Sequence, residues 1–172
     1  NGAEALKALY ALQEKDLEID RLRAEAESLP EELVALQGQV ETLEERLTNL
    51  LERRAELERE YNRHSLDIED LSAKEKQAEE EQKRAQSARE QTQYENRIQQ
   101  IKDRIRELLE LSTPIMEAME NLEAEIAQVE EELAALRPRL QELLEANRAR
   151  VAELEAAIAA KVRRVIDRDI PI

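Results

Sequence analysis

The side chains best suited to chemistry are two runs of carboxylates and a single histidine. The carboxylates are Glu79–Glu81 and Glu130–Glu132. Paired carboxylates work as general acid and base when burial separates their pKa values. Consecutive residues of a helix point in different directions, so each run predicts a solvated face rather than a buried pair. The sequence therefore predicts a protein that is not an enzyme and has no catalytic residues.

The histidine and the absence of cysteine decide whether a metal site is expected. Di-iron helical bundles use Glu-x-x-His pairs, but Tyr61 stands three residues before His64. Because the chain contains no cysteine, it has no thiolate zinc site and no disulfide. His64 falls on an apolar stripe, where a hydrogen-bonded core histidine is expected. We therefore expect no metal and no other cofactor within these 172 residues.

Positive charge gathers in two places, although the whole chain has a net charge of -15. Between residues 83 and 106, seven basic residues stand against three acidic ones. Such patches contact phosphates or an acidic protein surface. The alternative is that these charges only balance neighbouring carboxylates, as mixed charge on helix faces does. The candidate nucleic-acid or partner-binding residues are Lys83, Arg84, Arg89, Arg97, Lys102, Arg104 and Arg106, with Arg163 and Arg164 near the C-terminal end.

The composition indicates what kind of element carries these residues. Of 172 residues, 39% are charged and only 2% are aromatic, with two Gly and four Pro. A core without rings has to be built from aliphatic side chains, and this composition is typical of long helices and coiled coils. No apolar run reaches the length of a membrane span, and no signal peptide is visible. We therefore expect a cytoplasmic protein without membrane contact.

Two stripes of mostly apolar residues repeat every 3.5 residues, which is the period of a coiled-coil seam. The first stripe is Leu12, Lys15, Ile19, Leu22, Ala26, Leu29, Leu33, Leu36, Val40, Leu43, Leu47, Leu50, Arg54, Leu57, Tyr61, His64, Ile68 and Leu71. The second stripe is Tyr94, Ile98, Ile101, Ile105, Leu108, Ser112, Ile115, Met119, Leu122, Ile126, Val129, Leu133 and Leu136.

The stripes predict an all-α fold, a long antiparallel coiled-coil helical hairpin that forms a single domain over residues 1–172. The first helix is expected over about residues 3–84, the turn over about 83–93 and the second helix over about 92–168. Ser87 or Thr92 is expected to cap the second helix. With the turn centred near Ala88, facing residue numbers sum to about 176, so Arg54 should reach Glu123 or Glu125. The alternative is one uninterrupted helix that pairs with a second copy as a homodimer.

Two prolines predict irregularities in these helices. Ser28-Leu29-Pro30-Glu31 has the Ser-x-x-Glu spacing of a capping box. The first helix is therefore expected to kink or restart near Pro30. A second kink is expected near Pro114, where Ser112 and Thr113 precede the proline. A continuous helix that tolerates the proline is the alternative.

Several short segments resemble one bacterial family. They are Leu29–Leu33, Gln93–Ile98, Leu108–Leu111, Met116-Glu117 and a helix end at Ile170-Pro171. The family consists of coiled-coil hairpin proteins that carry a C-terminal four-cysteine zinc ribbon. The resemblance implies a ribbon with bound zinc beyond residue 172, because none of its cysteines is present here. It also implies a protein partner in transcription or secretion, with nucleic acid as a further possible ligand.

Three functions fit these observations. The first is a non-enzymatic adaptor or chaperone-like protein that binds a protein or nucleic-acid partner through its ends. The second is nucleic-acid binding through the basic residues at the turn. The third is a purely structural oligomeric rod.

Overall fold

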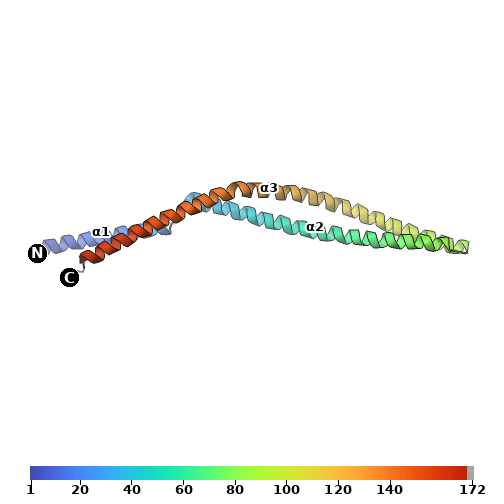
Figure 1. Cartoon of the computed structure of the whole chain (residues 1–172), viewed down its shortest axis with the longest axis horizontal. Helices are drawn as coiled ribbons and strands as arrows, with labels where there is room; N and C mark the ends of the chain where they lie inside the picture. The colour runs from blue at the N-terminus through green and yellow to red at the C-terminus, as the bar shows by residue number, and fades with distance from the viewer. Residues whose placement is uncertain (170–172) are drawn as a thin grey trace. The chain divides into compact units, whose positions relative to one another are not determined.

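The computed structural model describes residues 1–169, which form three α-helices (Figure 1). Helix α1 spans Gly2–Glu27, α2 spans Glu31–Lys83 and α3 spans Ala88–Asp169. Among residues 1–169 no strand forms, and the all-α prediction is confirmed. The helix end expected at Ile170-Pro171 lies outside the described residues.

The chain divides into two compact units. The first unit contains residues 1–43 and the described residues from 132 onward, and the second unit contains residues 44–131. The first unit thus holds α1, the start of α2 and the end of α3. The second unit holds the rest of α2 and α3, which lie side by side there (Figure 1).

The turn between α2 and α3 occupies residues 84–87, inside the window expected from the sequence. Ser87 caps α3, because its hydroxyl oxygen accepts a hydrogen bond of 3.1 Å from the Glu90 amide. The Glu90 carboxylate in turn accepts one of 3.1 Å from the Gln86 amide. At the end of α2 the Arg84 and Ala85 amides bond to carbonyls three residues back, which tightens the last turn. Within residues 1–169 no residue has a positive φ, so the turn needs no glycine.

The predicted capping box at Ser28 and Glu31 is wrong. Ser28 is the C-cap of α1, in an extended conformation, and its hydroxyl donates 3.1 Å to the carbonyl oxygen of Glu25. Helix α2 starts one residue after Pro30, whose carbonyl oxygen accepts from the Val34 amide. A proline disfavours helical backbone in the residue before it, so the chain leaves the helix at Ser28 and starts again after Pro30. The expected restart near Pro30 is therefore present, with different cap residues.

Helix α3 does not break at Pro114, since it is assigned as helix through that residue. The helix is thus continuous at the proline, and the kink expected near Pro114 stays a prediction. The two polar residues before the proline bond backwards along the helix: the Ser112 hydroxyl donates to the Leu108 carbonyl at 2.8 Å, and Thr113 donates to Leu109 at 3.1 Å. These bonds keep both hydroxyls satisfied within their own helix.

Both apolar stripes are the packed faces of the helices. Every member of the second stripe is buried or half-buried, and in the first stripe only Leu29, in the break, is exposed. Leu33, Leu108 and Leu133 are each 1% exposed. Burying a leucine side chain contributes roughly 1.5–3 kcal/mol. Aliphatic packing along the stripes is thus the main source of stability in each unit.

Candidate functional site

Four of the predicted binding residues surround the turn, and we name them the turn cations. Lys83 is the last residue of α2, Arg84 lies in the turn, and Arg89 lies in the first turn of α3. Arg97 follows further along α3. All four are exposed, and none forms an ion pair with another part of residues 1–169.

Two acidic residues near the turn cations, Glu90 and Glu81, have partners of their own. Glu90, next to Arg89, accepts the hydrogen bond from the Gln86 amide. Glu81 lies beside Tyr94, which is half-buried. Burial raises the pKa of Tyr94, and the charge of Glu81 and its hydrogen bond to the phenol raise it further. Tyr94 is thus a neutral neighbour of Glu81 at neutral pH.

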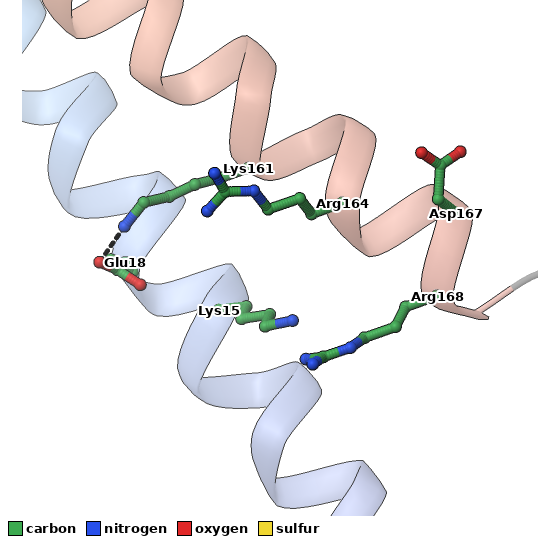
Figure 2. A pocket seen from close by; sticks show the side chains of 6 residues that line it. All are labelled: Lys15, Glu18, Lys161, Arg164, Asp167 and Arg168. Atoms are coloured by element: carbon green, nitrogen blue, oxygen red, sulfur yellow. Dashed lines mark hydrogen bonds and ion pairs between the residues drawn. The ribbon is translucent and has the colours of Figure 1, made fainter.

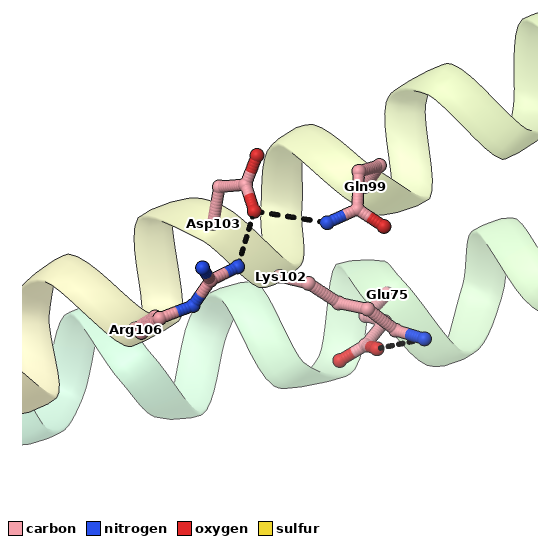
Figure 3. A network of polar contacts seen from close by, with 5 residues as sticks. All are labelled: Glu75, Gln99, Lys102, Asp103 and Arg106. Atoms are coloured by element: carbon pink, nitrogen blue, oxygen red, sulfur yellow. Dashed lines mark hydrogen bonds and ion pairs between the residues drawn. The ribbon is translucent and has the colours of Figure 1, made fainter.

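The other three basic residues predicted near the turn pair with carboxylates, and Figure 3 shows the pairs of Lys102 and Arg106. Lys102 reaches across from α3 to Glu75 of α2, with 3.8 Å between Nζ and Oε1. Arg106 pairs with Asp103 on its own helix, and Gln99 also donates to that carboxylate at 2.9 Å. The remaining residue, Arg104, pairs with Glu107 at 3.0 Å. The charges of these three residues are therefore balanced by neighbouring carboxylates, which is the alternative given in the sequence analysis.

The two predicted basic residues near the C-terminal end differ in position. Arg164 lines a groove of about 500 Å³ between α1 and α3 of the first unit (Figure 2), whereas Arg163 is exposed beside it and does not line the groove. We name this the Lys15 groove. Its lining residues are Lys15, Glu18, Lys161, Arg164, Asp167 and Arg168.

One ion pair closes an end of the Lys15 groove. Lys161 of α3 donates to the carboxylate of Glu18 on α1. This hydrogen bond and the lysine charge lower the pKa of Glu18 against a smaller opposing effect of desolvation, and the charges of Arg21 and Lys15 lower it slightly more. Glu18 is thus held ionised by cations from both helices.

Arg150 has a role that the sequence patterns did not reveal. Its Nη1 donates to the Glu25 carbonyl oxygen at 2.8 Å, and its Nη2 donates to the Ser28 carbonyl oxygen at 2.7 Å and to Asn147 Oδ1 at 2.9 Å. Basic side chains that bond the last carbonyls of a helix stabilise its C-terminal end. The signal in the sequence was the facing-number rule, which places Arg150 next to residue 26.

Within residues 1–169 no three His, Asp or Glu side chains gather into a group able to hold a metal ion. His64 lies on the packed face, half-buried, with Nε2 4.0 Å from the Glu60 carboxylate of the preceding turn. In the described part of the chain no helix is both long and apolar enough to cross a membrane.

Comparison of the chain with known protein families, with curated proteins and with solved structures finds no match.

Proposed function

We propose that this chain is a non-enzymatic adaptor, or a chaperone-like protein, built as an antiparallel coiled-coil hairpin that presents the turn cations to an acidic surface of a protein partner. The observation that carries the proposal is the contrast among the predicted basic residues. Lys102, Arg104 and Arg106 are paired, while the four nearest the turn are exposed and unpaired.

Contacts in the second unit support antiparallel pairing. Arg54 donates to Glu123 at 2.8 Å, and Lys102 pairs with Glu75. The residue numbers sum to 177 in both pairs. A constant sum is expected where one helix rises in number as its neighbour falls.

Contacts in the first unit have residue numbers that sum to values near 177. Arg139 pairs with Glu32 at 2.8 Å, with numbers that sum to 171, and Lys161 pairs with Glu18, with numbers that sum to 179. Both units thus favour the hairpin over one uninterrupted helix that pairs with a second copy.

A cysteine pair tests the hairpin directly, on a background without native cysteine. Leu43→Cys with Leu133→Cys should form an intramolecular disulfide on mild oxidation, seen as a mobility shift on non-reducing gels at low protein concentration. Leu43→Cys with Leu108→Cys is the mismatched control and should not. Exclusively intermolecular products from the matched pair would contradict the hairpin.

The adaptor is tested with two polyanions, polyglutamate as an acidic protein surface and duplex DNA as a nucleic acid. Arg84→Glu with Arg89→Glu should abolish polyglutamate binding measured by fluorescence anisotropy. Arg59→Glu with Arg63→Glu changes the charge equally on two exposed arginines of an acidic part of α2 and should have little effect. Equal losses in both variants would argue against the turn as the binding site. Tight DNA binding with a steep salt dependence and none of polyglutamate would favour the nucleic-acid alternative.

Sedimentation velocity separates the adaptor from the structural rod. A monomer over a wide concentration range agrees with the adaptor. Assembly beyond a dimer that grows with concentration would support the rod instead.

A further inference from the structure

We propose that the Lys15 groove is a binding site for a small polyphosphate anion, held by Lys15, Arg164 and Arg168. This site lies in the first unit and is separate from the turn cations, so it does not depend on the proposed adaptor function.

The first argument is the charge inside the groove. Four of its six lining residues are basic and two are acidic. Lys161 is bonded to Glu18, but Lys15, Arg164 and Arg168 form no ion pair within residues 1–169. The hydrogen bond with Lys161 is the chief cause of the lowered pKa of Glu18, and the charge of Lys15 is a minor cause. The groove therefore keeps an excess of positive charge in a chain that is strongly acidic.

The second argument is how the side chains of Lys15 and Arg168 point. In Figure 2 the amino group of Lys15, from α1, and the guanidinium of Arg168, from α3, are directed toward one another. The carboxylate of Asp167 is directed away from both. Like charges that converge without a counterion repel each other, and a bound anion would remove that repulsion.

The third argument is the position of Lys15 in the sequence. It occupies a place in the first stripe where most members are apolar, and it is half-buried. A polar residue on a coiled-coil seam lowers stability compared with an apolar one. Lys161 faces the same groove from α3 and is also half-buried, so two lysines occupy partly buried positions there. An anionic ligand bound in the Lys15 groove would explain why lysines occupy these positions.

The chemistry of the cations indicates the class of anion. Guanidinium groups bind phosphate oxygens through two parallel hydrogen bonds, and lysine adds a point charge. Two arginines and a lysine on different sides of a groove of about 500 Å³ fit an anion with several phosphate groups better than a single carboxylate.

The test uses sodium tripolyphosphate and the 172-residue chain, by isothermal titration calorimetry at constant ionic strength. Lys15→Gln and Arg168→Gln should each weaken binding by about tenfold or more, as expected for loss of a charge-assisted contact. Arg163→Gln removes the same charge from the neighbouring exposed residue and should leave the affinity unchanged. Without the anion, Lys15→Gln should raise the melting temperature, because it removes a repulsive charge.

Three results would overturn the proposal. One is no binding of tripolyphosphate to the unaltered chain. Another is an equal loss of affinity in Arg163→Gln and in the two groove variants, which would show diffuse attraction rather than a site. The third is binding of a duplex oligonucleotide that depends on Lys15 and Arg168 while tripolyphosphate does not bind, which would assign the groove to nucleic acid.

Discussion

Arg150 of α3 donates a hydrogen bond of 2.7 Å to the carbonyl oxygen of Ser28, at the point where α1 has ended and α2 has not begun. The same guanidinium also bonds the Glu25 carbonyl oxygen, and its Nε is buried without a partner. The break before Pro30 leaves carbonyl groups that the helix itself cannot satisfy, and Arg150 satisfies two of them from another helix.

Replacing Arg150 should therefore destabilise the first unit. Arg150→Gln should lower the free energy of unfolding by about 1–3 kcal/mol, the usual range for hydrogen bonds to a charged group. Arg148→Gln, at an exposed position on the same helix, is the control and should change it by less than about 0.5 kcal/mol. Urea denaturation followed by circular dichroism measures both. Equal effects of the two substitutions would show that the bonds to Glu25 and Ser28 do not stabilise the break.

Gly38 lies inside α2, and a Cβ added there would meet nothing within 4 Å. Gly38→Ala should therefore raise the free energy of unfolding by about 0.5–1 kcal/mol, because alanine loses less backbone entropy in a helix. Gly2→Ala, at the first residue of α1, should have a smaller effect since helix ends fray. The urea midpoint reports both effects. A lower midpoint for Gly38→Ala would mean that position 38 has no room for a methyl group.

The two serines at helix ends should respond differently to alanine. Ser87→Ala removes the oxygen that accepts from the Glu90 amide and should cost about 1 kcal/mol of stability. Ser28→Ala removes only a hydroxyl that donates to the Glu25 carbonyl oxygen. That oxygen still accepts from Arg150, so this substitution should cost less. Thermal unfolding of the two variants side by side gives the comparison. A larger loss of stability for Ser28→Ala than for Ser87→Ala would support a capping box at Ser28 and Glu31.

The Glu18 and Lys161 pair makes stability depend on pH in the acidic range. Because the folded-state pKa of Glu18 is lowered, the pair stabilises the fold above the unfolded carboxyl pKa of about 4.3. That contribution is lost as the pH falls from this value through the lower folded pKa. Glu18→Gln should therefore reduce stability at neutral pH and flatten its acidic decline.

The control for that titration is Glu14→Gln, which changes an exposed carboxylate without an ion pair on the same helix. It should leave the acidic decline as it is in the unaltered chain. Unfolding free energies from urea titrations between neutral and acidic pH would show the difference. Identical pH profiles for the two variants would mean that Glu18 is not held by Lys161 in solution.

The packed faces could be predicted from the sequence because they depend only on local spacing. The period of 3.5 residues identified the buried positions, and Leu29 departs from it because it lies in the break. The contact between Arg54 and Glu123 also followed from the expected facing numbers.

The caps and the charge pairs were harder to predict. Ser-x-x-Glu occurs both at Ser28 and at Ser87, and the spacing alone does not say whether the serine belongs to the preceding helix or to the following one. Similarly, the sequence does not show that Lys102 is paired and Arg97 is not, because Glu75 lies on another helix and its distance depends on side-chain reach. The basic cluster at the turn was therefore predicted as seven residues, of which four are unpaired.

The turn at residues 84–87 uses no positive φ within the described chain, and the hydrogen bonds around it come from Gln82, Ser87, Glu90 and the backbone. Folding therefore places little restriction on the identity of residue 84. In evolutionary terms this position is free to drift, so a basic residue that persists there in related chains would be under selection for binding rather than for folding.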